Sequence, residues 1–291
     1  MTDADIEPAS TAILADDWGD RRAWFAFAVA NPRCRVFVAE ADDGGIVGTG
    51  VATVNGRVGW IGTIWVASAW RGHGLGRALT EAPIETAEEA GCRTLVLVAT
   101  EAGRPLYERL GFEVQTWYRT MEAPGRAGTE AAATDGTAAR GASPSRIAHP
   151  GRRIRAWRPG DLDAMAALDA AVTGEDRRHA LEWFASPAST RVVICEDDDR
   201  AAGFVVRASW GGGATIAPRL EDALALLDAR RDTYPADRRV RAGIVLDNKA
   251  GAAALEADGW TEAWRAPRLV QGQPLVWEPS GIWGQFDHAL G

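Results

Sequence analysis

The sequence predicts an α/β fold, more strictly α+β, in which one arrangement of strands and helices occurs twice. In the first half, three strands joined by hairpin turns lead into a glycine-rich loop that opens a helix (residues 35–90). The same order of elements returns between residues 154 and 269. Because an internal duplication is the simplest source of a repeated element order, we expect two mixed, mostly antiparallel twisted sheets flanked by helices.

The composition is that of a globular chain with an acidic surface. Apolar residues make up 46% of the 291 residues, charged residues 25%, and the formal net charge is −8. No Lys/Arg block is interleaved with aromatic residues, so a nucleic-acid partner is disfavoured. No apolar run approaches the roughly 20 residues that span a bilayer, and the N-terminus is acidic where a secretory signal is basic. We therefore expect a cytoplasmic protein with no membrane partner.

The metal-binding residue types are scattered. Cys34, Cys92 and Cys195 are odd in number and far apart, and the four histidines are equally dispersed. This pattern gives neither a zinc spacing nor a disulfide framework, so we assign no metal.

Hydrophobic patterning and turn residues place the elements of the first half. Asn55-Gly56 is the strongest two-residue hairpin signal in the sequence. Pro83 lies inside a helical pattern and is expected to bend or break that helix. Strands are predicted at 6–10, 35–39, 46–54, 58–66, 94–98 and 112–121, and helices at 16–30, 75–90 and 103–110.

The loop Arg71-Gly72-His73-Gly74-Leu75-Gly76-Arg77 has the features of an anion site. Glycines at alternate positions let the backbone bend tightly and keep side chains away from its amide groups. The helix that follows points the positive end of its dipole at the same spot, where a diphosphate would bind. Arg71 and Arg77 are expected to add mobile positive charge.

Two motifs in the first half resemble the GNAT (Gcn5-related) N-acetyltransferase family. The acetyl-CoA loop of that family reads Arg/Gln-x-x-Gly-x-Gly/Ala, which residues 71–76 match at every fixed position. Residues 100–112 resemble a later motif, in which a tyrosine, here Tyr107, precedes Gly-Phe by four residues. The resemblance covers about residues 5–122. Ser68 stands where a proline is common, and Glu101 lies in a region that often holds an asparagine.

The resemblance implies an acyl-CoA N-acyltransferase whose co-substrate is acetyl-CoA or another acyl-CoA. The sheet of this family splays open between the strands at 58–66 and 94–98, where the pantetheine arm pairs with the backbone. Tyr107 would donate a proton to the departing thiolate, and such acid catalysis typically contributes about 10²–10⁴ in rate. The cofactor-binding residues would be Trp65, Val66, Arg71, Gly72, His73, Gly74, Leu75, Gly76 and Arg77.

The expected reaction is direct attack of a small-molecule primary amine on the acyl group in a ternary complex. Most alkylamines are protonated near pH 7, so a base must take a proton, directly or through water. Glu40 and Glu101 are candidates, although a solvated surface carboxylate is the more ordinary interpretation of each.

Three segments are expected: an acetyl-CoA-binding, catalytic domain (1–122), a flexible Ala/Gly/Ser/Pro linker (123–152), and a degenerate GNAT-like domain (153–291). In the second half, residues 216–222 stand where the glycine loop stood, and Leu255 takes the place of Tyr107. Tandem GNAT proteins with a degenerate C-terminal half resemble this organisation. Strands are predicted there at 154–158, 191–195, 203–208, 215–217, 240–246 and 260–269, and helices at 162–171, 178–184, 220–230 and 249–257.

The second half is expected to serve structure or the acceptor site. Its tryptophans Trp260, Trp264, Trp277 and Trp283 offer flat apolar surface for an organic amine, with core packing as the default for most of them. On this view a fragment ending near Pro124 would bind acetyl-CoA without acetylating the native acceptor.

Three other functions are compatible with parts of the sequence pattern. A nucleotide-binding oxidoreductase is disfavoured because three strands precede the loop and Leu79 replaces the last glycine of Gly-x-Gly-x-x-Gly. A non-catalytic acyl-CoA sensor stays open because binding and catalysis share the loop. An acyl-carrier protein also stays open as the donor, because the sheet gap contacts the pantetheine arm and not the nucleotide.

Overall fold

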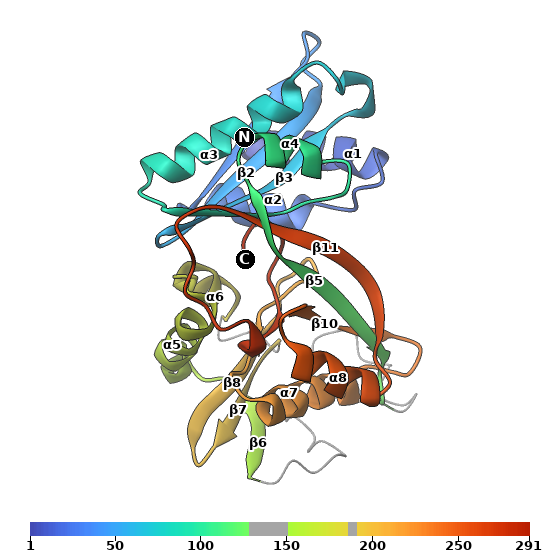
Figure 1. Ribbon diagram of the computed structural model, residues 1–291. Helices are drawn as coiled ribbons and strands as arrows, with labels where there is room; N and C mark the ends of the chain where they lie inside the picture. The colour runs from blue at the N-terminus through green and yellow to red at the C-terminus, as the bar shows by residue number, and fades with distance from the viewer. Residues whose placement is uncertain (128–150, 186–190) are drawn as a thin grey trace. The chain divides into compact units, whose positions relative to one another are not determined.

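The computed structural model describes residues 1–127, 151–185 and 191–291, which divide into two compact units (Figure 1). Unit 1 comprises residues 1–115, 268–275 and 287–291, and unit 2 comprises residues 116–267 and 276–286. This division differs from boundaries at 122 and 153, because two C-terminal segments belong with the N-terminal half. Most of the linker expected at 123–152 lies outside the described residues, and its two ends are strand residues. No helix of the described residues is long and apolar enough to cross a membrane.

The chain begins with a helix, α1 (Asp3–Ala15), so the strand expected at 6–10 is wrong. Thr2 and Asp5 form a capping box in which the Asp5 carboxylate accepts hydrogen bonds from the Thr2 amide (2.6 Å) and hydroxyl (3.0 Å). Ala9 and Ile13 are buried four residues apart, as one face of a helix requires. The capping signal was the feature that the strand prediction overlooked.

The sheet of unit 1 has the order β1-β2-β3-β4-β11. The first three strands are antiparallel, β3 pairs with β4 in parallel, and Arg268–Gly272 of β11 runs antiparallel to β4. The pairing of β11 with β4 was not predicted. The strands are β1 (Cys34–Glu40), β2 (Ile46–Asn55), β3 (Val58–Val66), β4 (Thr94–Val98) and β11 (Thr261–Gly272), and all but the last keep their predicted positions within a residue.

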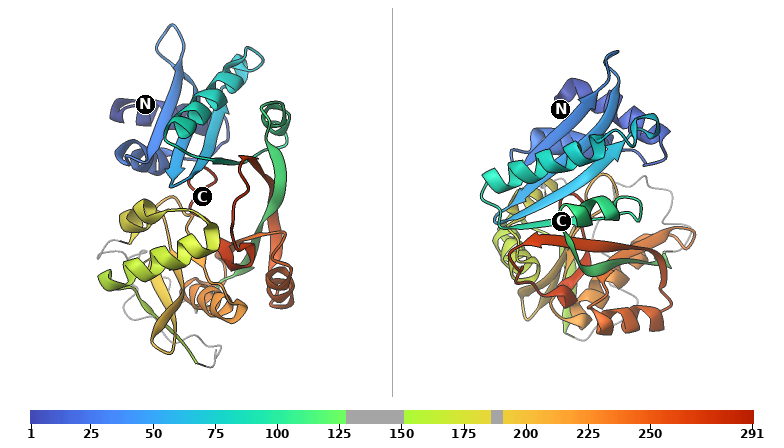
Figure 2. Two further views of the ribbon diagram at one scale, coloured as in Figure 1. Left: turned by 60° about the vertical axis from the view of Figure 1, so that its left-hand side comes forward. Right: turned by 45° about the horizontal axis from the view of Figure 1, so that its top comes forward.

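Helices cover both faces of this sheet, with α1 and α2 (Arg22–Ala30) on one side and α3 (Leu75–Glu89) on the other (Figure 2). Glycines in the strands let α3 approach closely: a Cβ at Gly50 would lie 2.4 Å from the Leu79 carbonyl oxygen. Pro83 cannot donate a hydrogen bond to that carbonyl, which lies instead against the backbone of Gly50. The helix runs unbroken through Pro83, so the break considered from the sequence does not occur.

The C-terminal tail, residues 287–291, is part of the core of unit 1. The Thr53 hydroxyl donates to the Ala289 carbonyl (2.7 Å) and the Asn55 amide to the Leu290 carbonyl (2.8 Å), both in buried surroundings. A Cβ at Gly62 would lie 2.3 Å from that of Ala289, so the tail lies directly on the sheet.

From its first two helices onward, unit 2 repeats the element order of unit 1, but it begins with a strand that unit 1 lacks. Its sheet has the order β12-β9-β8-β7-β6, and β10 pairs with the part of β5 that belongs to this unit. The short strand β12 was not predicted. The last helix of unit 1 is α4 (Arg104–Arg109), and β5 (Glu113–Pro124) runs from unit 1 into unit 2. The other helices and strands of unit 2 are β6 (Arg152–Ala156), α5 (Leu162–Thr173), α6 (Arg178–Phe184), β7 (Val192–Asp197), β8 (Arg200–Val206), β9 (Thr215–Ile216), α7 (Leu220–Thr233), β10 (Arg239–Val245), α8 (Lys249–Ala257) and β12 (Ile282–Gly284).

Unit 1 includes two segments from the C-terminal end of the sequence, and this changes what we expect of a fragment ending near Pro124. That fragment lacks the strand that pairs with β4 and the tail that covers β2 and β3. We therefore expect it not to fold stably, so the role of the second half is better tested by point substitutions in the full chain.

Deleting residues 287–291 should destabilise unit 1 by about 2–4 kcal/mol, because it leaves the buried Thr53 and Asn55 side chains without these partners and uncovers the sheet. Chemical denaturation followed by tryptophan fluorescence measures this loss. Thr11→Val, which removes a hydrogen bond at the surface, is the control and should change stability little. Unchanged stability of the deletion variant would show that the tail is not a core element.

Candidate functional site

The loop between β3 and α3 has the backbone that its glycines predict. Gly72 (φ +81°) and Gly74 (φ +87°) are both in the left-handed region, and Gly74 is the N-cap of α3. Nothing lies within 4 Å of a Cβ added at either position, so backbone conformation and not crowding requires glycine there.

The start of α3 presents free amide donors. Among the described residues, none accepts a hydrogen bond from the backbone N–H groups of residues 72–76, whereas Arg77 and Ala78 already donate to the Gly74 carbonyl. Gly72, His73 and Gly74 are exposed, and Leu75 and Gly76 are half-buried. A row of unpaired N–H groups at a helix N-terminus fits a phosphate or diphosphate.

The two arginines of the loop, which were expected to add mobile positive charge, both have carboxylate partners. The Arg71 guanidinium donates to the Val66 carbonyl (2.9 Å) and to Asp16, which also accepts from the Trp65 indole (3.0 Å). Arg77 pairs with Glu81 one helical turn away at 2.8 Å. Arg71 thus fastens the loop to the end of β3, and Asp16 is a residue that the sequence interpretation missed.

A bulge bends β3 in the middle of the sheet. Thr49 pairs with Trp65 and Val51 with Gly62, so Gly50 lies opposite two residues, Thr63 and Ile64. Thr63 takes the left-handed conformation (φ +50°), and its carbonyl accepts from the Thr49 hydroxyl (2.8 Å). The Trp24 indole donates to the Thr63 hydroxyl (3.0 Å), so the bulge is held from both sides.

The ladder between β3 and β4 ends early. The parallel pairing covers only Val58–Trp60 with Thr94–Val96, although β3 continues to Val66 and β4 to Val98. The bulge lies in the part of β3 beyond the ladder. The ladder thus stops before either strand ends, as a splay between these strands would require.

Tyr107 lies in the apolar cluster beside this splay. Its side chain is buried with Ile61 and Leu97, the residues just beyond the last paired positions, and contacts Phe112 edge to face at 6.4 Å. Burial raises the pKa of Tyr107 to about 12. The hydroxyl is therefore protonated at neutral pH. Among the described residues, no side chain or backbone group forms a hydrogen bond with it, so it is free to donate to a ligand.

The loop between β3 and α3 lies next to α4, the helix that carries Tyr107. A Cβ at Gly76 would lie 3.7 Å from a methyl group of Leu106 and 3.9 Å from one of Val66. The N-terminus of α3, the end of β3 and the helix α4 therefore meet at one place.

Other residues predicted for the site lie apart from it or are exposed. Trp65 is buried and can offer only its backbone, while Glu40 and Glu101 are exposed. Of the four tryptophans considered for an acceptor surface, Trp260 and Trp283 belong to the core of unit 2 and Trp264 is 42% exposed. The four therefore do not form one exposed surface.

The second copy has a closed helix start. Asp222, in the first turn of α7, is fully buried and pairs with Arg152 (2.7 Å) and Arg219 (2.8 Å). The Ala217 amide donates to Gly281, whereas the corresponding loop amides of unit 1 are free. A carboxylate thus lies where an anion would bind.

The strand gap of the second copy is filled as well. In this copy β9 precedes the helix as β3 does in unit 1, and β12 pairs with β9 through Ile282 and Ile216. Gly284 of β12 also approaches β10, because a Cβ at Gly243 would lie 3.7 Å from its Cα. The Trp283 indole donates to the Ala217 carbonyl (3.1 Å), and Leu255 is a core residue. Only the apolar triplet Ile-Trp-Gly marks β12 in the sequence.

Comparisons with known proteins agree with this geometry. Residues 4–112 match the model of the acetyltransferase (GNAT) family. No curated protein matches the sequence. A putative acetyltransferase from Pyrococcus horikoshii is similar in structure over 100% of this chain and 94% of its own, with a TM-score of 0.76 and 18% identity.

Two further solved structures are similar over nearly the whole chain. A GCN5-related N-acetyltransferase from Sphaerobacter thermophilus has a TM-score of 0.63 and 16% identity, covering 95% of this chain and 96% of its own. A tandem GNAT protein from the clavulanic acid biosynthesis pathway has a TM-score of 0.59 and 14% identity, covering 94% and 98%. At such identities these matches establish the fold.

The fold is thus that of a tandem GNAT protein, with two sheets flanked by helices. The match to the acetyltransferase (GNAT) family lies in residues 4–112, which make up most of unit 1.

Gly74→Glu should weaken CoA binding by at least about 10-fold, because the new carboxylate lies beside the amide groups that would hold a diphosphate. Gly91→Glu is a matched control at the other end of α3. Gly91 has nearly the same backbone (φ +89°) and the same empty surroundings, so it imposes the same strain. Calorimetric titration with CoA separates them, and equal affinities of the two variants would refute the loop assignment.

Proposed function

We propose that unit 1 transfers an acetyl group from acetyl-CoA to a primary amine of a small molecule. The observation that carries this proposal is the meeting of three features: the free amide groups at the start of α3, the splayed ends of β3 and β4, and the Tyr107 cluster. The amide groups would hold the diphosphate. The pantetheine arm would lie along the open edge of β3, which directs the thioester toward Tyr107.

The proposed chemistry is a single displacement. The amine nitrogen forms a bond to the acyl carbon while the carbon–sulfur bond breaks, and the electron pair of that bond goes to sulfur. The Tyr107 hydroxyl donates to the sulfur, and the amine loses a proton to water or to a carboxylate such as Glu40 or Glu101.

The pKa values of the Tyr107 phenol and of the departing CoA thiol decide whether the phenol proton is transferred to sulfur or only shared in a hydrogen bond. A thiol has a pKa near 8.5 in water, well below the value of about 12 for Tyr107, so in a wet site the phenol would only hydrogen-bond to the thiolate. Burial raises thiol pKa values as well, as it does for Cys34, to about 12. If the CoA thiol is as buried as Tyr107, the pKa values of the two groups are similar, and transfer of the proton to sulfur costs little free energy.

A small-molecule acceptor has support from both charge and relatives. The acidic chain has no basic surface block for a nucleic acid. A protein with the same tandem organisation belongs by name to the biosynthesis of a small molecule, clavulanic acid.

Two alternatives share the same site. The pantetheine arm can belong to an acyl-carrier protein, and the chain can bind acyl-CoA without transferring the acyl group. Mass spectrometry of molecules retained by the purified protein, followed by thiol release assays with acetyl-CoA or acetylated carrier protein and a panel of amines, distinguishes them. Retention of acyl-CoA without thiol release for any amine would contradict the proposed reaction.

Tyr107→Phe should lower kcat by roughly 10-fold or more and leave the Kd for acetyl-CoA nearly unchanged, because the lost hydroxyl acts mainly in the transition state. Single-turnover kinetics and calorimetry measure the two quantities. Tyr118→Phe is the matched control, since it removes a hydroxyl from another buried tyrosine of the chain.

The pH profile gives a second test of Tyr107. Because burial raises its pKa to about 12, the neutral donor form persists at every pH below that value. Wild-type kcat should therefore show no loss on the alkaline side up to about pH 10, where an unperturbed phenol is half ionised. A fall in kcat that starts well below pH 10 and is absent in Tyr107→Phe would assign Tyr107 a different role.

A further inference from the structure

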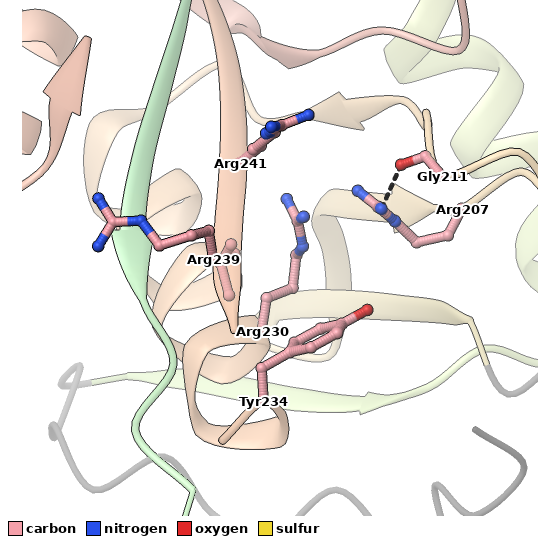
Figure 3. A pocket seen from close by; sticks show the side chains of 7 residues that line it. Arg207, Gly211, Arg230, Tyr234, Arg239 and Arg241 are labelled. Carbon is pink, nitrogen blue, oxygen red and sulfur yellow. Dashed lines mark hydrogen bonds between the residues drawn. The ribbon is translucent and has the colours of Figure 1, made fainter. Parts of the chain in front are cut away.

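Unit 2 contains a pocket of about 220 Å³ at the C-terminal end of α7 (Figure 3). This is the opposite end of the helix from the closed start at Asp222, so the pocket does not correspond to the CoA loop of unit 1. Its polar lining is contributed by Arg207, Arg230, Tyr234, Arg239 and Arg241.

Arg230 is the central residue of this pocket. It lies in the last turn of α7 and is 8% exposed, and its guanidinium points into the space between Arg207 and Arg241. No described residue forms a hydrogen bond or ion pair with that guanidinium. Burial and the like charge of Arg207 lower the pKa of Arg230 to about 9, which leaves the group charged at neutral pH.

Arg207 brings a second cation to the same space from the end of β8. Its guanidinium donates to the Gly211 carbonyl, which is neutral, and burial lowers the pKa of Arg207 too. The Tyr234 side chain lines the same pocket, and its hydroxyl points to the side on which Arg207 lies (Figure 3). A neutral carbonyl and a phenol do not compensate two positive charges.

The arginines on β10 are only partly neutralised. Glu122 lies 3.2 Å from Arg239 and 3.6 Å from Arg241, so one carboxylate faces two guanidinium groups. The Arg239 side chain extends away from the other arginines, whereas Arg241 points toward Arg207 (Figure 3). The side chain of Arg241 is 69% exposed and marks the mouth of the pocket.

This arrangement is unusual for the chain. Its net charge is −8, and buried arginines elsewhere in unit 2 have carboxylate partners, such as Arg177 with Asp169 at 2.6 Å. A buried cation without a counter-charge costs folding free energy unless an anion binds it. Three guanidinium groups and a phenol supply more donors than one carboxylate can accept, and they suit the four oxygens of a phosphate.

We infer that this pocket binds a phosphate group, either as inorganic phosphate or as the phosphate of a small phosphomonoester. Arg207, Arg230 and Arg241 would contact its oxygens, and Tyr234 would donate a further hydrogen bond. Bound phosphate supplies the counter-charge that the described part of unit 2 does not give to Arg230.

The test is calorimetric titration of the full chain at constant ionic strength, with inorganic phosphate in one arm and glycerol phosphate in the other. Arg241→Gln, at the exposed mouth, should raise the Kd by about 3-fold or more, and Arg207→Gln by about 10-fold or more. Arg200→Gln is the matched control. Arg200 is exposed at the start of β8, the strand that leads to Arg207, and it does not line the pocket. Tighter binding in one arm identifies the source of the phosphate.

Thermal melting gives an independent readout, since a ligand that binds the folded state raises Tm. Phosphate should raise the Tm of the wild type and of Arg200→Gln, and do so less for Arg207→Gln and Arg241→Gln. The proposal is overturned if wild-type chain shows no saturable phosphate binding, or if Arg241→Gln and Arg207→Gln bind phosphate as tightly as wild type.

Discussion

The bulge in β3 is the constraint on which the candidate site of unit 1 depends. Thr63 is held in a left-handed conformation that costs a β-branched residue about 1–2 kcal/mol. Partly buried hydrogen bonds from Thr49 and Trp24 offset that cost. Gly50 opposite the bulge allows α3 to lie against β2, so the bend in the strand and the position of the helix are fixed together. The early end of the ladder with β4 places an open strand edge beside the free amide groups of α3.

Where two strands of a sheet splay apart, their backbone N–H and C=O groups need other hydrogen-bond partners. In unit 1, β4 pairs on its other side with β11, and the ladder toward β3 ends at Trp60 and Val96. In unit 2, β12 occupies the corresponding place beside β9, and Trp283 fixes it through the Ala217 carbonyl. In unit 2 the chain itself thus fills the place beside the strand that precedes the helix, whereas in unit 1 this is where we propose that the pantetheine arm binds.

Local sequence signals predicted most of the elements, because they depend on interactions within a few residues. The hairpin at Asn55-Gly56 and the left-handed glycines of the α3 loop follow from backbone conformation alone. The error at residues 6–10 arose because a segment of five residues is too short to separate strand from helix, while the Thr2–Asp5 cap does separate them. The chemistry proposed for Tyr107 remains a prediction.

Long-range pairings could not be predicted from the same signals. A strand was predicted at 260–269, but nothing in that segment specifies β4 as a neighbour 170 or more residues earlier. Likewise Arg71 was expected to be mobile, since its partner Asp16 is distant in sequence and reaches it only through the folded sheet. The arginine pocket is a stronger case, because its residues come from β8, α7 and β10 and no local motif connects them.

The two anion environments of the chain rest on different physics. At the start of α3 the donors are neutral amide groups, which water can solvate when no ligand is bound, so an empty site costs little. In the arginine pocket the donors carry full charges, and burial of Arg230 makes the empty state costly. An amide cradle therefore suits a substrate that must arrive and leave at every turnover. A buried arginine cluster suits a ligand that is retained, because release restores the uncompensated charge.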